Sequence, residues 1–70
     1  MRGHELQGIR QTAKRSQAEF GELVGVHRTT VSEWETGKTD VPELVEAIAR
    51  IIDAKPEFVF ELERARGLRK

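Results

Sequence analysis

Seventy residues are enough for one small hydrophobic core, so the sequence predicts a single domain over residues 1–70 with no room for a separate sensing or catalytic module. The chain contains no cysteine, which excludes disulfides, thiolate metal sites and a cysteine nucleophile. Its 12 basic and 12 acidic side chains cancel, so the net charge by itself does not indicate a nucleic-acid partner.

Three helices are predicted in the amino-terminal half of the chain. Between residues 4 and 14, apolar residues recur at spacings of three and four, which is the period of one buried helical face. A second helix begins after Ser16, whose hydroxyl forms a capping-box pattern with Glu19, and it ends just before Gly25. Because Gly25 can adopt the left-handed conformation that stops a helix, we expect a tight turn before a third helix over about residues 27–36.

Two more helices are predicted in the carboxy-terminal half. Asp40 and Glu43 have a second capping-box spacing, with Pro42 in the first turn of the apolar helix that follows. The last helix is predicted over about residues 56–66, and residues 68–70 are expected to fray. No segment alternates with period two over the length of a strand, so the predicted fold class is all-α.

The segment of about residues 16–36 has the arrangement of a helix-turn-helix, in which one short helix lies in a DNA groove and the other braces it. The stretch SQAEFGELVGVHRTTVSEWETGK, from Ser16 to Lys38, resembles the Cro/C1 repressor family, also called the XRE family. The resemblance extends more loosely from Ile9 to about Phe60, and it implies a five-helix, lambda-repressor-like DNA-binding domain. The features that carry it are Gln17 at the start of the second helix, the glycine turn, Val31, and Trp34-Glu35 followed by Gly37-Lys38.

This resemblance implies which residues contact DNA. Gln17 would bind one phosphate, helped by free backbone amides and the helix dipole, and Lys38 would bind another. Base readout falls to the amino end and outer face of the third helix, namely to His27, Arg28, Thr29, Ser32 and Glu33. Arg28 and Thr29 are the strongest candidates, since arginine forks onto the two acceptors of guanine and a threonine methyl packs on thymine.

Several of these assignments have plainer alternatives. Gln17 and Lys38 are also compatible with ordinary solvated side chains, and Arg28 with a phosphate contact. Glu33 is suited to accept a hydrogen bond from the cytosine amino group, but it is also suited to keep the helix soluble or to repel wrong sequences.

Other residues of the motif are expected to cap helices, pack in the core or form ion pairs. His27 caps the third helix, contacts DNA or does neither, and Thr30 lies closer to the inner side, where it packs or contacts phosphate. Trp34 is expected in the core rather than stacked on a base, because it follows Val31 by three residues on the inward face. In the Cro/C1 family, an arginine of the first helix commonly pairs with a glutamate near the end of the third; the resemblance implies a partly buried ion pair between Arg10 and Glu35.

The sequence departs from the family pattern at two positions. Gly21 stands where alanine is usual, a change that costs up to about 1 kcal/mol in an exposed helix, and close helix packing is the expected compensation. Asp53 stands where a glycine commonly ends the fourth helix, so we expect Asp53 to adopt the left-handed conformation.

Small members of this family often dimerise through the segment that corresponds to the last predicted helix. On a helical wheel Phe60 points almost opposite to Phe58 and Leu62, so burial of those two would leave Phe60 exposed. We therefore predict a homodimer interface at Phe60, Val59 and Ile52. The alternative for Phe60 is a single exposed aromatic residue, which needs no explanation.

The function predicted from these features is sequence-specific binding of double-stranded DNA by a transcriptional repressor. A homodimer would present two recognition helices about 34 to 36 Å apart and would require an inverted-repeat operator. The regulated operon would be its own or a neighbouring one, in a phage or another mobile element. Alternatives are an antitoxin with a toxin partner, a restriction-modification controller and, from a different class, a protein-interaction module that has lost DNA binding.

Other classes of function have little to support them in the sequence. There is no nucleophile-base pair at usable spacing and no phosphate-cradling glycine loop, so we expect no enzymatic activity. His4 and His27 are the only histidines and neither has a second strong ligand at metal-binding spacing, so no metal or cofactor is predicted. No apolar run reaches the length of a membrane span and no secretion signal is present, so the expected location is cytoplasmic.

Overall fold

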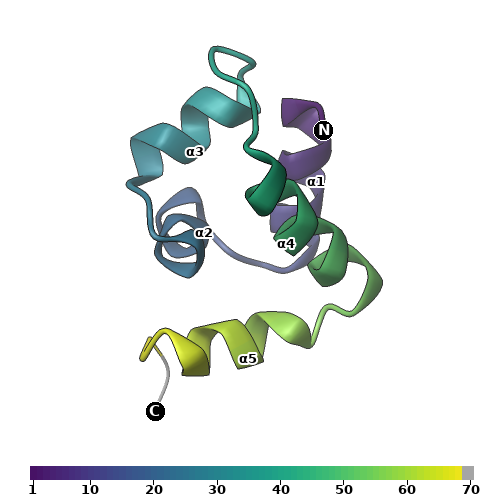
Figure 1. Ribbon diagram of the computed structural model, residues 1–70, viewed down its shortest axis with the longest axis vertical. Coiled ribbons are helices and arrows are strands. Elements are labelled where there is room, and N and C mark those ends of the chain that lie inside the picture. The colour runs from purple at the N-terminus through teal and green to yellow at the C-terminus, as the bar shows by residue number, and fades with distance from the viewer. Residues whose placement is uncertain (69–70) are drawn as a thin grey trace.

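Five helices follow one another along residues 1–68, the part of the chain that the computed structural model describes (Figure 1). They are α1 (Gly3–Thr12), α2 (Gln17–Val24), α3 (Arg28–Glu35), α4 (Glu43–Ala54) and α5 (Phe58–Ala65). No strand occurs in this range, which confirms the predicted all-α fold class. Of the segment expected to fray, residues 69–70 lie outside the described residues.

The helices pack around one core to which each contributes. In Figure 1, α3 lies at one end of the molecule and α5 at the other, with α1, α2 and α4 between them. α2 packs mainly against α3, α1 packs against α3 and α4, and α5 crosses α2 and α4. The buried apolar side chains are Leu6, Ile9, Phe20, Leu23, Val31, Trp34, Val45, Ala49, Ile52 and Val59.

The positions of Ile52 and Val59 correct the predicted dimer interface. Each side chain is only 2% exposed, because α4 and α5 turn these residues toward the core of their own chain. Neither side chain is available to a second protomer. Of the three predicted interface residues, Phe60 alone lies at the surface.

The ends of α2 form as the sequence predicts. The Ser16 hydroxyl accepts a hydrogen bond from the backbone N–H of Glu19 at 3.0 Å, and the Glu19 carboxylate accepts one from the N–H of Ser16 at 2.8 Å. This capping box satisfies two of the free backbone groups around the helix start. At the other end Gly25 has φ of +80°, the left-handed conformation that ends α2 and opens the tight turn to α3.

The start of α4 differs from the prediction. No capping box forms between Asp40 and Glu43, because Pro42 is the N-cap residue and has an extended conformation with φ of −61° and ψ of 148°. Glu43 is therefore the first residue of the helix instead of the third. Asp40 is exposed and lies too early in the chain to cap it.

The end of α4 also differs. Asp53 stays helical and does not adopt the left-handed conformation, since α4 continues to Ala54. The helix stops because Lys55 precedes Pro56, and the proline ring disfavours helical dihedrals at the preceding residue. Lys55 accordingly has φ of −137° and ψ of 84°.

Gly21 in α2 packs closely against the backbone of the turn that leads into α3. A β-carbon at Gly21 would lie 2.5 Å from the carbonyl oxygen of Val26, and this oxygen belongs to the backbone of the turn. Such a distance forces the backbone to move. The close approach is the compensation expected for a glycine inside a helix.

We expect Gly21→Ala to lower the free energy of unfolding by about 1 to 2 kcal/mol, because the overpacking outweighs the gain in helix propensity. Urea denaturation followed by circular dichroism measures the difference. Gly8→Ala is the matched control, since a β-carbon at Gly8 in α1 meets nothing within 4 Å. This control should gain about 0.5 to 1 kcal/mol from propensity alone. Equal gains in both variants would contradict the role assigned to Gly21.

Candidate nucleic-acid interface

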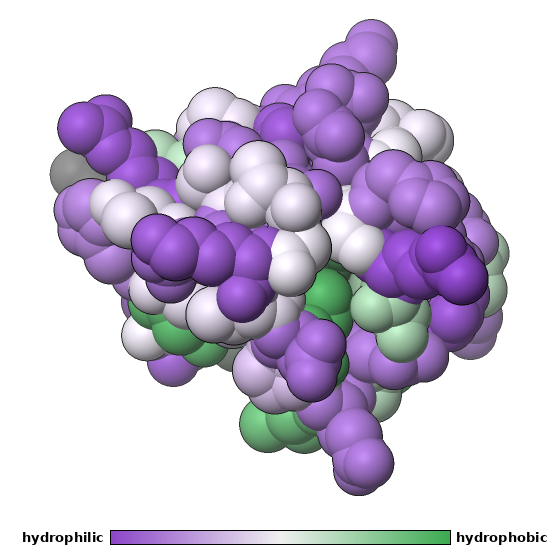
Figure 2. Space-filling model, turned by 90° about the horizontal axis from the view of Figure 1, so that it is seen from above, coloured by the Kyte–Doolittle hydropathy of each residue, from purple (hydrophilic) through white to green (hydrophobic). Residues whose placement is uncertain are grey.

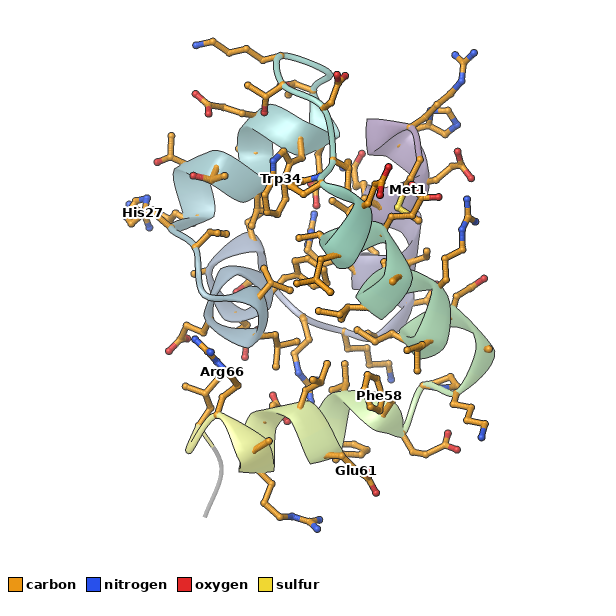
Figure 3. All side chains as sticks on the ribbon, viewed as in Figure 1. Met1, His27, Trp34, Phe58, Glu61 and Arg66 are labelled. Carbon is orange, nitrogen blue, oxygen red and sulfur yellow. The ribbon has the colours of Figure 1, made fainter. Side chains whose placement is uncertain are left out.

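The amino end of α3 is an exposed helix terminus capped by a side chain. Nδ1 of His27 accepts a hydrogen bond from the backbone N–H of Thr29 at 3.1 Å and lies 3.0 Å from the Thr29 hydroxyl. The imidazole therefore acts as the N-cap, one of the three roles that the sequence left open. Figure 3 shows His27 at the tip of α3, pointing away from the core.

The outer face of α3 carries the residues predicted to contact bases. Arg28 and Thr29 are exposed, whereas Ser32 and Glu33 are partly buried farther along the same helix. Thr30 is also partly buried, which agrees with its expected place toward the inner side. Within residues 1–68, no hydrogen bond or ion pair engages the guanidinium of Arg28. This side chain can therefore reach a ligand without breaking an existing contact.

Beyond the end of α3, Lys38 lies near Glu33, one of the two glutamates of that helix. Its ammonium nitrogen is 3.7 Å from a carboxylate oxygen of Glu33, and the lysine side chain is largely in solvent. An exposed pair of this kind contributes little free energy, so an external phosphate can compete for the lysine. Figure 2 looks onto the end of the molecule that carries α3 and the segment after it, and hydrophilic side chains cover most of this face.

A buried ion pair lies directly behind this surface. Arg10 Nε is 2.6 Å from Glu35 Oε2, and Arg10 Nη2 donates to Glu35 Oε1 at 3.0 Å, so the expected pair is present as a two-bonded fork. The third donor, Arg10 Nη1, binds the carbonyl oxygen of Arg15 at 2.8 Å. One guanidinium therefore joins α1 to the end of α3 and to the segment that leads into α2.

Gln17 belongs to the same cluster, a contact that the sequence did not predict. Its Nε2 donates a hydrogen bond to Glu35 Oε1 at 3.0 Å across 18 positions of the chain. The carboxylate thus fixes the side chain of Gln17 at the amino end of α2, next to backbone amides that helix geometry leaves free. A side chain oriented in advance loses less conformational entropy when it binds a phosphate.

A second arginine fixes α5 to the segment between α1 and α2. Arg15 Nε and Nη2 bind the two carboxylate oxygens of Glu63 at 2.8 and 3.0 Å, and Arg15 Nη1 binds the carbonyl of Ala13 at 3.0 Å. Its guanidinium also lies over the ring of Phe60, 5.6 Å from the ring centre. The segment includes Lys14, which has a φ of +57°, the one non-glycine residue with positive φ in the described range.

The capping box of α2 makes the stability of this region depend on pH. The backbone N–H of Ser16, and then its hydroxyl, lower the pKa of Glu19 from its ordinary value of 4.5, since both favour the charged carboxylate. A lowered pKa in the folded state means that the carboxylate stabilises the fold above pH 4.5, and that this contribution is lost as the pH falls through the folded-state pKa.

We expect Glu19→Gln to reduce the loss of stability on acidification between roughly pH 5 and pH 3. Glutamine retains the hydrogen bond to Ser16 but has no proton to gain, so the two proteins should have similar stability near neutrality. Urea denaturation at a series of pH values measures this. Glu22→Gln, in the same helix, is the control for a general change in charge. Parallel pH curves for wild type and Glu19→Gln would contradict the linkage.

No helix among the described residues is long and apolar enough to cross a lipid bilayer. Nor do three histidine, aspartate or glutamate side chains of residues 1–68 come together as they would around a metal ion.

Comparison with known proteins gives one positive result. A family model described as a helix-turn-helix domain matches residues 3–62. The match covers α1 to α4 and the first part of α5, so it includes all of the predicted DNA-contact residues, which run from Gln17 to Lys38. No curated protein and no solved structure gives a significant match.

Proposed function

The chain belongs to the helix-turn-helix domain family, and we propose that it is a sequence-specific transcriptional repressor of the Cro/C1 type. Family membership supports binding of double-stranded DNA and a role in transcription regulation. The proposal adds that the protein acts as a homodimer on an inverted-repeat operator. It also adds that the operator controls the protein's own operon, in a phage or another mobile element.

The exposed amino end of α3 is the observation that carries this proposal. Arg28 is the first residue of the helix, and within the described residues its guanidinium makes no hydrogen bond or ion pair. Next to it is Thr29, whose backbone N–H donates to the capping imidazole of His27. In the proposed complex this end enters the major groove, where Arg28 binds the two acceptors of a guanine and Thr29 packs on a thymine methyl. Ser32 and Glu33 read the next positions along the helix.

Phosphate contacts position the domain on the duplex. One phosphate is bound by the side chain of Gln17, which Glu35 holds in place, and by the backbone amides at the amino end of α2. Lys38 leaves the carboxylate of Glu33 and binds a second phosphate. The whole chain has no net charge, so general attraction to DNA is weak. Specific binding then depends on a few contacts. The logarithm of the binding constant should fall linearly with the logarithm of the salt concentration, with a slope of about −0.9 for each neutralised phosphate.

Binding to the DNA upstream of the protein's own gene, measured across a salt series beside an unrelated duplex, tests the proposal. We expect salt-dependent binding with a preference for the upstream DNA. Arg28→Ala should weaken binding to that duplex by about 1 to 3 kcal/mol and abolish most of the preference. Arg64→Ala is the matched control, because it removes one exposed arginine from α5, which lies at the opposite end of the molecule from α3.

The control variant should bind like the wild type. Loss of preference in both variants, or equal affinity of the wild type for both duplexes at every salt concentration, would contradict the assignment of α3 as the recognition helix. The absence of any binding would favour a protein-interaction role.

A further inference from the structure

The imidazole of His27 contacts Thr29 at two points. Its Nδ1 accepts a hydrogen bond from the backbone N–H of Thr29 at 3.1 Å, and the same nitrogen lies 3.0 Å from the Thr29 hydroxyl oxygen. A ring nitrogen that accepts a hydrogen bond from an amide carries a lone pair and no proton. The neutral ring of His27 therefore has its proton on Nε2.

The unprotonated Nδ1 determines the direction of the Thr29 hydroxyl. Two lone pairs that face each other across 3.0 Å repel, so the hydroxyl hydrogen lies between the two atoms and the hydroxyl donates to Nδ1. This hydroxyl has no other partner among residues 1–68, and the side chain is exposed. The remaining lone pairs of its oxygen are free. Thr29 thus offers an external ligand a hydrogen-bond acceptor and a methyl group, but no donor.

We propose that His27 is a positioning residue that limits Thr29 to bases with an amino group in the major groove. The inference rests on the proposed function, because it concerns the end of α3 that is proposed there to enter the groove. Adenine and cytosine present amino donors in the major groove, whereas guanine and thymine present carbonyl acceptors. A hydroxyl oxygen that can only accept binds the amino bases and is repelled by the carbonyl groups.

The methyl group of Thr29 selects between the two amino bases. Thymine, the partner of adenine, carries a methyl group in the major groove, and guanine, the partner of cytosine, has none. An A·T pair therefore satisfies both groups of the side chain. The adenine amino group donates to the hydroxyl oxygen, and the thymine methyl contacts the threonine methyl. The base pair assigned to Thr29 is A·T, with adenine facing the hydroxyl.

A guanine or thymine in the place of this adenine requires the hydroxyl to turn. Its hydrogen must move from Nδ1 to the carbonyl group of the base, which leaves two lone pairs face to face across 3.0 Å. The loss of this hydrogen bond corresponds to about 5- to 10-fold weaker binding. The imidazole therefore contributes to base selection without contacting the base.

Binding-site selection from a double-stranded DNA library with a randomised segment, followed by sequencing of the bound fraction, tests this assignment. The pair read by Thr29 is the one whose preference changes in Thr29→Val, which replaces the hydroxyl by a methyl group. At that pair the wild type should favour adenine about 5- to 10-fold over guanine or thymine. Thr36→Val is the matched control, since the exposed Thr36 donates its hydroxyl to the carbonyl of Ser32. This control should select the same sequences as the wild type.

Substitutions of His27 show whether it acts through Thr29. His27→Gly should reduce the preference to less than about two-fold while α3 still forms, because glycine is tolerated at an N-cap. His27→Asn should retain the preference, since the asparagine oxygen also accepts from the amide and the hydroxyl. In the Thr29→Val background, His27→Gly should change no base preference. A direct contact of Nε2 with DNA predicts a loss of preference in His27→Asn and a change in the Thr29→Val background.

Long-range ¹H–¹⁵N spectra of the free protein test the same arrangement without DNA. In the neutral ring of His27, Nε2 should carry the proton, and a proton on Nδ1 would overturn the inference. Three results of the selection would also overturn it: guanine or thymine at the pair read by Thr29, no pair that responds to Thr29→Val, or a full preference in His27→Gly. Failure of the wild type to select any sequence would refute the proposed function itself, a result distinct from each of these.

Discussion

Replacement of Arg10 by methionine is expected to lower the free energy of unfolding by about 3 to 5 kcal/mol. The Arg10 and Glu35 side chains are only 10% and 3% exposed, so the variant leaves a buried carboxylate whose remaining side-chain partner is the amide of Gln17. It also removes the donor to the carbonyl of Arg15. The free energy of unfolding of a 70-residue domain is roughly 4 to 10 kcal/mol, so this one change removes a large part of it.

Urea denaturation of the two single variants and the double variant measures the effect as a thermodynamic cycle. Arg10→Met with Glu35→Met should cost much less than the sum of the single changes, because no isolated charge remains in the interior. Arg50→Met is the control, since its guanidinium pairs with Glu5 and Glu46 at the surface. This control should lose no more than about 1 kcal/mol. Strict additivity of the single losses would show that the pair does not act as a unit.

Trp34→Ala is expected to destabilise the domain by about 3 to 5 kcal/mol, because it leaves a large void between α3 and the rest of the core. Trp34 is buried, and a β-carbon placed at Gly3 would collide with the carbonyl oxygen of Trp34, so the start of α1 packs closely on this part of α3. Circular dichroism in urea is the appropriate measurement, since the variant lacks the only tryptophan and hence the usual fluorescence signal.

Trp34→Phe separates core packing from base stacking. The smaller ring should recover part of the lost stability and leave DNA affinity unchanged under conditions in which the protein is folded. A variant with wild-type stability and weakened DNA binding would instead assign Trp34 to the interface with DNA.

Local patterns predicted the helix-turn-helix well because short-range chemistry determines it. The capping box of Ser16 and Glu19 and the left-handed Gly25 involve groups within a few residues of each other, and both are present. The same reasoning failed at Asp40 and Asp53, where a neighbouring proline sets the backbone instead. In those two places the spacing of capping residues was a weaker determinant than the restriction that proline imposes.

Contacts between distant residues set the limit of prediction at the candidate site. The family pattern indicated the partnership of Arg10 with Glu35, but nothing in the linear sequence connects Gln17 with Glu35. A helical wheel gave the correct exposure of Phe60, yet it could not show that Arg15 covers the ring. For the same reason it did not show that Val59 and Ile52 face their own core, since a wheel describes one helix and not its neighbours.

The two arginine clusters also act as reversible cross-links. Arg10–Glu35 and Arg15–Glu63 join positions 25 and 48 residues apart, spans over which small extracellular domains often use disulfides. A disulfide also restricts the unfolded chain, whereas an ion pair disappears on unfolding and leaves the unfolded chain its full entropy. A chain whose distant segments are joined by ion pairs can unfold and refold without any change of oxidation state. Because this chain contains no cysteine, a reducing environment has no disulfide to break.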